Sequence, residues 1–307
     1  MNFATDAIIL LEQSHYAFLA ITILKMIDWW IYPLILFIVS FFIGIVGVLG
    51  GLGGGTLFVP IVSGFFPFHI DFIRCSGLLL ALCGSLSAGP KLLEKGLANL
   101  RLSIPCALIA SISSIFGAML GLVLPTNIIQ VSLGILVIAI AIIFVLSKST
   151  EYPSVKKEGG LPSLLKINGS YYEESKEKEI HWKIHRMRRG LFLFIMVGFI
   201  AGMFGIGAGW ANVSILNLIM GVPLKLAVGT SVFLLSITDT SAAWVYITKG
   251  CLFPMIVIPS IFGVMLGTKV GVRLLTKTHP KIIRYIVIAL LIFVGIRSLL
   301  KGFGIWL

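Results

Sequence analysis

The chain has 307 residues, of which 58% are hydrophobic and only 12% are charged, and its mean hydropathy is +1.07. A soluble domain carries about a quarter charged residues and cannot bury so much apolar surface in one core. The composition therefore predicts an integral membrane protein and argues against a secreted protein, a cytosolic enzyme or a DNA-binding protein. The formal net charge of +12 gathers in loops between apolar segments, a pattern that orients membrane proteins, so we expect no nucleic-acid partner.

Residues 1–30 mix charged and apolar side chains. They contain no clear hydrophobic core region and no small-residue cleavage site, so a cleaved signal peptide is not expected. We predict an N-terminal amphipathic or transmembrane helix, which crosses the membrane or lies in its interface. Trp29, Trp30 and Tyr32 would form an aromatic belt at its end.

Two series of apolar segments follow, and both are expected to form membrane helices. The first repeat, 31–147, contains the segments 31–49, 56–66, 74–90, 102–124 and 128–147. The second repeat, 190–307, contains the segments 190–206, 210–221, 229–248, 252–272 and 282–300. Between the repeats, residues 148–189 carry ten Lys or Arg and six Glu, which predicts a charged cytoplasmic linker.

The two series match each other when the first is shifted by 154 residues. The glycines that then coincide are Gly51, Gly53 and Gly55 with Gly205, Gly207 and Gly209. Further matches follow in the same order along the chain. The apolar segments and their repetition predict an all-α, polytopic membrane helix bundle of two homologous repeats. Internal repeats in such a protein are typical of transporters.

The basic loops 91–101 and 273–284 bear on how the two repeats are oriented. If all five segments of each repeat cross the membrane, both loops lie on the same side as the linker and the repeats are inverted. If the short segments re-enter instead, the repeats are parallel and the second loop lies outside. The positions of the positive charges favour inversion.

Glycine-rich breaks precede the short segment in each repeat, at 50–55 and at 202–209. Glycine does not continue a helix comfortably, and the segments that follow would span only about 18 Å of a hydrocarbon core about 30 Å thick. We expect half-helices that meet near the membrane midplane, or short bent crossings. Free N–H groups and the helix dipole at such breaks favour an anion, whereas the alternative is close packing through small residues.

Each repeat thus carries a glycine-rich run, a short apolar segment, and a helix that opens with Ser or Thr and ends in a basic residue plus glycine. This order resembles the TauE/SafE family of sulfite exporters, also called the four-toluene-sulfonate uptake permease family. The family motif G-x-G-G-G-x-x-x-x-P fits Gly51 to Pro60 fully. The resemblance covers about residues 40–147 and 190–300. It implies transport of sulfite, thiosulfate, organosulfonates or related anions across the cytoplasmic membrane.

The second copy of the motif departs from the family pattern at three positions. Ala208 replaces a glycine, Ser214 replaces the proline, and Asn212 is polar where an apolar residue is usual. Thr230 and Ser231 match the family's Thr-Ser helix start, and the corresponding residues around Ser76 match it less well. These departures affect which substrate is expected, whereas the expected class of protein, a membrane transporter, stays the same.

The candidate substrate-binding residues lie at the breaks and at the helix starts that follow them. They are Gly51, Gly53, Gly54, Gly55, Ser76, Gly205, Gly207, Gly209, Asn212, Thr230 and Ser231. The hydroxyls would donate to oxyanion oxygens, or would pack between helices. Arg74 and Lys269 would attract an anion, or would anchor their helices at the membrane interface.

Asp239 lies in the middle of an apolar segment, where a carboxylate is costly unless it is paired or hydrated. We interpret it as a candidate coupling residue that carries a proton. The alternative is a structural ion pair with Lys269. The counterpart of Asp239 in the first repeat is Ser85, so the charge is not part of the shared scaffold.

The sequence contains no CxxC pair, no metal-ligand cluster and no phosphate-binding G-x-x-x-x-G-K-[ST] motif, so we expect no metal and no cofactor. We predict a secondary transporter of a small sulfur-containing anion rather than an enzyme. Alternating access between the repeats and proton coupling are the expected mechanism. The expected partners are the substrate and the bilayer of the inner cell membrane, and a homo-oligomer is left open. A passive anion channel or a transporter of a non-sulfur organic anion is the alternative.

Overall fold

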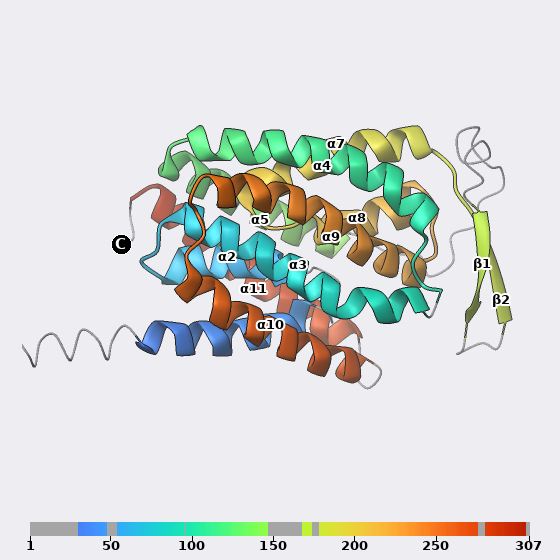
Figure 1. Ribbon diagram of the computed structural model, residues 1–307, viewed down its shortest axis with the longest axis horizontal. Helices are drawn as coiled ribbons and strands as arrows, with labels where there is room; N and C mark the ends of the chain where they lie inside the picture. Colours follow the sequence, from blue (N-terminus) through green and yellow to red (C-terminus); the bar gives the residue numbers. More distant parts are fainter. Residues whose placement is uncertain are drawn as a thin grey trace, which may run out of the picture.

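The computed structural model is a bundle of long helices with a small β-hairpin at one end (Figure 1). It describes residues 30–47, 54–94, 96–146, 168–173, 178–275 and 280–304. Seven helices in this part of the chain are long and apolar enough to cross a membrane. The predicted all-α, polytopic membrane bundle is thereby confirmed. Of the predicted N-terminal helix only Trp30 is described, and the linker residues 148–167 lie outside the described residues.

The helices agree with the apolar segments and extend several of them by about one turn. The first helix is Trp30–Gly47, and it is followed by α2 Gly54–Phe65, α3 Ile70–Glu94, α4 Leu100–Val123 and α5 Thr126–Leu146. The second repeat contains α7 Met187–Phe204, α8 Gly209–Ser214, the π-helical η1 Ile215–Ile219, α9 Leu224–Thr248, α10 Pro254–Leu275 and α11 Pro280–Gly302. Strands β1 Asn168–Glu173 and β2 Lys178–Lys183 lie between the repeats.

The chain passes repeatedly between two ends of the bundle, here called the hairpin end and the far end (Figure 1). The hairpin end contains the α3–α4 connection, the start of α7 and the end of α10, and with them Arg101 and Arg273. The far end contains the α2–α3 and α9–α10 connections and the end of α11. The gathering of basic residues predicts that the hairpin end is cytoplasmic.

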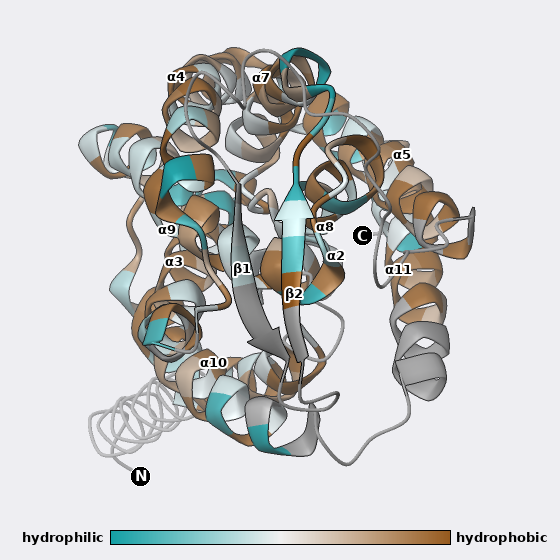
Figure 2. Cartoon of the chain, turned by 90° about the vertical axis from the view of Figure 1, so that its right-hand side faces the viewer, coloured by the Kyte–Doolittle hydropathy of each residue, from teal (hydrophilic) through white to brown (hydrophobic). Residues whose placement is uncertain are grey.

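The hairpin is an element that the sequence analysis did not predict. Its strands pair antiparallel, with Asn168 opposite Lys183. Trp182 and Ile184 are buried in the main hydrophobic core, and the His185 N–H donates to the Met220 carbonyl at 3.1 Å. Viewed from the hairpin end, the two strands lie in front of α2 and α8 (Figure 2). The polar linker thus ends in a structured segment that is attached to the end of η1.

Glycines bring helices of the two repeats into close contact. In the pair α4 and α7, a Cβ at Gly117 or Gly202 would collide with a carbonyl of the partner helix. The first helix and α10 approach each other in the same way at Gly263 and Gly267. Small residues allow this backbone approach, which supplies packing contacts inside a membrane where the hydrophobic effect does not drive helices together.

Candidate functional site

The start of α2 lies against the second glycine break. The Thr56 hydroxyl donates to the Ile206 carbonyl at 3.0 Å, and both groups are buried. Helix α3 contacts both sides of this junction: a Cβ at Gly55 would lie 2.6 Å from the Gly77 carbonyl oxygen, and a Cβ at Gly77 would lie 2.6 Å from that of Gly205. The junction therefore joins the two repeats in the middle of the bundle.

The second break turns the chain out of α7 and into α8 through two left-handed glycines. Gly205 ends α7, and both Gly205 and Gly207 have φ of +69°. Residues with a Cβ rarely adopt this conformation, which explains the glycines at these positions. The N–H groups from Ile206 to Trp210 donate to no acceptor among the residues that the structure describes. Such consecutive N–H groups are suited to an anion.

The carboxylate of Asp239 faces this break. A Cβ at Gly207 would lie 3.2 Å from Asp239 Oδ2 and 3.3 Å from the Ala81 Cβ. Asp239 is fully buried, and neither carboxylate oxygen has a hydrogen-bond partner within the described ranges. Lys269 is exposed on α10, so the ion pair considered from the sequence is not formed. A buried carboxylate without a partner is costly, so this position remains a candidate functional residue.

Further unpaired polar atoms lie on α8 and α9 beside the break. They are Asn212 Oδ1, Trp210 Nε1 and Thr238 Oγ1, all from buried residues and all without a partner in the described part of the chain. Asn212 was predicted as a candidate, and the sequence offered Thr238 as a hydrogen-bonding neighbour of Asp239, whereas Trp210 was missed. Trp210 follows the predicted site residue Gly209, and that proximity was the available signal.

The predicted hydroxyl residues are buried, and two of them make hydrogen bonds to the backbone. Ser76 donates to the Phe72 carbonyl of its own helix at 2.7 Å. Thr230 accepts from the Asn99 N–H at 3.3 Å, and it lies nine residues before Asp239, or about 13 Å along the helix. Ser231 is buried next to it. Thr230 is thus well separated from Asp239 along α9, whereas Ser76 lies between Arg74 and Gly77, which both contact Gly205 of the break.

Only Gly54 and Gly55 of the first glycine break lie among the described residues. Gly51 and Gly53 lie outside the described residues. A Cβ at Gly54 would lie 3.0 Å from Val264 Cγ2, and Gly55 packs on α3. For these two glycines, close helix packing explains the residue type.

Arg74 is buried, so it does not take the interfacial role considered from the sequence. It is 1% exposed and does not extend to the membrane interface. Its guanidinium donates to the Met203 carbonyl at 2.9 Å and pairs with Asp71, whereas its Nε has no partner among the described residues. Asp71 was missed, although its position three residues earlier on a helix was a usable signal.

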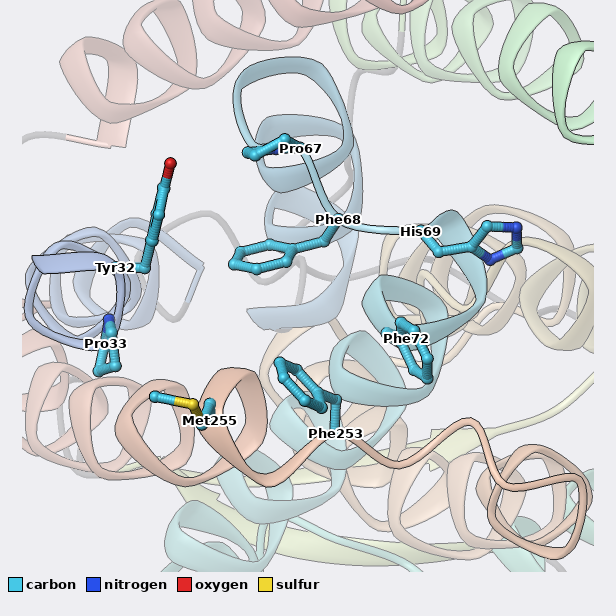
Figure 3. Close-up of a pocket in the computed structure, with 8 residues that line it drawn as sticks. All are labelled: Tyr32, Pro33, Pro67, Phe68, His69, Phe72, Phe253 and Met255. Carbon is cyan, nitrogen blue, oxygen red and sulfur yellow. The ribbon is translucent and has the colours of Figure 1, made fainter. Parts of the chain in front are cut away.

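An aromatic pocket of about 240 Å³ opens at the far end (Figure 3). It is lined by Tyr32, Pro33, Pro67, Phe68, His69, Phe72, Phe253 and Met255. The rings of Tyr32 and Phe68 meet edge to face with centroids 5.7 Å apart. The residues that line the pocket come from the first helix, from the α2–α3 connection with the start of α3, and from the α9–α10 connection with the start of α10. Within the described ranges no group of three His, Cys, Asp or Glu residues could hold a metal ion.

A bundle of membrane helices with repeated glycine breaks at a buried polar centre is typical of polytopic membrane transport proteins. The chain matches the family described as Sulfite exporter TauE/SafE over residues 36–298 and belongs to that family. The protein is accordingly a multi-pass membrane transporter, as the resemblance implied.

Named relatives agree with this class. The chain is 25% identical over 278 residues to the probable membrane transporter protein YunE of Bacillus subtilis, covering 86% of this chain and 98% of YunE. It is 25% identical over 282 residues to a probable membrane transporter protein of Methanocaldococcus jannaschii, covering 87% of this chain and 95% of that protein. It is also 25% identical to the probable membrane transporter protein ORF9 of a Sinorhizobium species, covering 86% of this chain and 91% of ORF9. No solved structure gives a significant match.

Proposed function

We propose that the protein is a secondary transporter of a small sulfur-containing anion, such as sulfite, thiosulfate or an organosulfonate, in the cytoplasmic membrane. The family description supports the sulfur oxyanion, and the relatives support membrane transport. The observation that carries the proposal is a buried carboxylate without a partner, facing a glycine break where the two repeats meet. The unpaired N–H groups of that break would hold the anion.

Asp239 would couple the anion to a proton. The anion would lie close to this carboxylate, because only Gly207 separates Asp239 from the N–H groups of the break. An ionised carboxylate would repel the anion, whereas the protonated acid could donate a hydrogen bond to it. Binding of the anion and binding of the proton would therefore favour each other.

The packing partners and the directions of the helices support inverted repeats. Helix α4 packs on α7 and α9, whereas α10 packs on the first helix and α3. Helices α3 and α9 pack on each other, as do α5 and α11. Any two-fold axis that exchanges the repeats would give these pairs. The directions favour an axis in the membrane plane, because α3 ends at the hairpin end whereas its counterpart α9 ends at the far end (Figure 1). Rocking of one repeat against the other would then provide alternating access to the centre.

The proposal is tested with purified protein in proteoliposomes. We would record substrate-induced currents on a solid-supported membrane for sulfite, thiosulfate, sulfate, taurine, sulfoacetate and chloride at two pH values. Counterflow of labelled substrate would follow for each anion, because electroneutral transport produces no current. We expect saturable transport of at least one sulfur anion. Silence in both assays across the panel would contradict a sulfur-anion transporter.

Counterflow also separates a carrier from a passive anion channel. A carrier exchanges labelled substrate for an excess of unlabelled substrate on the other side, because both use the same site in turn. A channel shows no such accumulation and does not saturate at low concentration. We expect counterflow, and flux without it would replace the transporter by a channel.

A further inference from the structure

Arg74 is the one buried Lys or Arg in the part of the chain that the structure describes. It lies on α3, in the first repeat, at the level where α7 of the second repeat ends. A buried guanidinium is costly unless its charge is paired and its N–H groups are bonded. Both Nη atoms of Arg74 have partners, whereas Nε has none among the described residues. The groups that contact the guanidinium therefore indicate what it does.

Those groups come from α3, α7 and α9, and α3 and α9 both meet the end of α7 there. Arg74 Nη1 donates to the Met203 carbonyl at 2.9 Å, and Nη2 pairs with Asp71. The guanidinium also lies over the Tyr246 ring, 5.4 Å from its centroid. The Tyr246 hydroxyl donates to the carbonyls of Gly202 at 3.0 Å and Met203 at 3.2 Å. Helix ends leave their last carbonyls without N–H partners, and Arg74 and Tyr246 supply the missing donors here.

The backbone of Arg74 touches the break as well. A Cβ at Gly205 would lie 2.6 Å from the Arg74 Cα, Cβ and carbonyl oxygen. Gly205 is the left-handed residue at which the chain leaves α7 for Gly207 and α8. The same residue of α3 thus contacts both the last carbonyls of α7 and the turn that follows them.

We propose that Arg74 is a positioning residue for the second glycine break, with Asp71 as its counter-ion. By holding the end of α7, its guanidinium sets the direction in which residues 205–209 present their N–H groups to the centre. It acts through Met203 and does not touch the anion. The inference rests on the proposed function in one respect, since it takes the break as the anion site.

The surroundings of Arg74 argue against a direct anion ligand. Asp71 pairs with the guanidinium, so a second anion would meet a carboxylate there. Asp71 also lies 3.4 Å from His69 Nδ1, at the far end of the bundle. In the repeat register the counterpart of Arg74 is Val228, which cannot donate a hydrogen bond. The contacts of Arg74 with the end of α7, here called the clamp, therefore have no equivalent in the other repeat.

The test uses Arg74→Met, Asp71→Asn and the double variant of the full chain in detergent. Two readouts need no substrate: the thermal midpoint, and the emission of Trp210, which is the second residue of α8 and is 7% exposed. The other five tryptophans are replaced by Phe so that only Trp210 emits. We expect both single variants to shift the Trp210 emission to longer wavelength. The Asp71→Asn variant should lose the most stability, because it leaves a buried guanidinium without a counter-ion.

The double variant decides whether the pair acts as a unit. We expect it to be more stable than Asp71→Asn alone, because the uncompensated charge is gone. Additive losses in the midpoint, or an unchanged Trp210 emission in Arg74→Met, would overturn the clamp. These outcomes do not depend on finding a substrate, so they are separate from a failure of the proposed function.

Transport kinetics give the third readout, with Arg101→Gln as the matched control, because Arg101 is exposed near the start of α4. For Arg74→Met we expect the maximal rate to fall about tenfold, with a smaller change in KM, and for Arg74→Lys a partial rescue. A direct ligand would instead raise KM first. It would also bind the anion more tightly in Asp71→Asn, where the competing carboxylate is removed.

Discussion

At the residue scale, the buried centre consists of the left-handed backbone of Gly207 and the carboxylate of Asp239 that faces it. Gly207 has φ of +69°, and the space where its side chain would be lies 3.2 Å from Asp239 Oδ2. A side chain there would be strained and would also crowd the Asp239 carboxylate that faces the break. The two effects can be separated by experiment.

We predict that Gly207→Ala reduces transport at least about tenfold while the protein still folds. The left-handed conformation costs a residue with a Cβ about 1–2 kcal/mol, and the methyl group occupies the site. The control is Gly250→Ala, which has φ of +74° and open space around it. It carries the same strain without the crowding, so it should keep its transport. Equal losses in both variants would attribute the effect to strain alone.

For Asp239→Asn we predict transport that no longer depends on pH. The amide matches the carboxyl in shape but cannot release a proton, so any coupling through this residue is lost. Initial rates of the preferred anion across a series of pH values provide the measurement. Ser85→Ala, at the counterpart position in the first repeat, is the control and should keep the wild-type profile. A pH profile that survives in Asp239→Asn would exclude this residue as the proton carrier.

Some residues of the site could be predicted from the sequence and others could not. Asp239 was evident because it is an acid inside an apolar segment, and Gly207 because the repeat duplicates it. The repeat register alone does not locate Ser76 and Thr230. It states which residues correspond, whereas the structure places Ser76 between two residues of α3 that contact Gly205, and Thr230 about 13 Å along α9 from Asp239. Correspondence between repeats does not bring residues together in space.

At the element scale, α2 is a short helix held at both of its ends. Its start is bonded to the second break through Thr56. At its other end Arg297 Nε donates to the Gly64 carbonyl at 2.7 Å, and Lys301 Nζ donates to the Ser63 carbonyl at 2.7 Å. Cations from α11 thus satisfy the last carbonyls of α2 and complement its dipole. The guanidinium of Arg297 also lies 3.8 Å from the Phe65 ring centroid.

We predict that Lys301→Met lowers the free energy of unfolding by about 1.5–3 kcal/mol, the usual value of a hydrogen bond to a charged group. The substitution keeps the length of the side chain and removes the donor. Thermal unfolding in detergent measures the effect, and Lys249→Met, at an exposed lysine after α9, is the control. If both variants unfold at the wild-type temperature, the end of α2 does not depend on this contact.

The elements show where sequence patterns were sufficient. The glycine breaks predicted the two short helices, since a run of glycines ends a helix. The hairpin was missed because its residues lie in a polar linker, and net composition hid the alternation of Ile180, Trp182 and Ile184. Apolar residues at every second position indicate a strand. Here they place Trp182 and Ile184 in the core.

At the scale of the whole molecule, the direction of the helices decides between inverted and parallel repeats. We predict that Cys placed at Arg101 and Arg273 reacts from the cytoplasmic side, and that Cys placed at Lys249 and Phe303 reacts from the outside. All four residues are exposed, and each pair lies at one end of the bundle. A membrane-impermeant maleimide on intact cells provides the measurement.

The labelling requires a background in which the four native cysteines are replaced. Its control is a permeant maleimide, which should label all four introduced positions. Parallel repeats would place Arg273 on the opposite side from Arg101. Labelling of these two positions from different sides would therefore reject the inverted arrangement.

The duplication reproduced the scaffold but placed the acid in one repeat only. Among the described residues Asp239 is the one buried acid, and the hydroxyl of its counterpart Ser85 donates to the Leu82 carbonyl at 2.8 Å. If Asp239 is the carrier, a cycle can take up one proton and no more. A singly charged anion would then cross with no net charge, and a doubly charged anion would carry one negative charge. The membrane voltage would act on the second and leave the first unaffected, so the ionisation state of the substrate would determine its energetics.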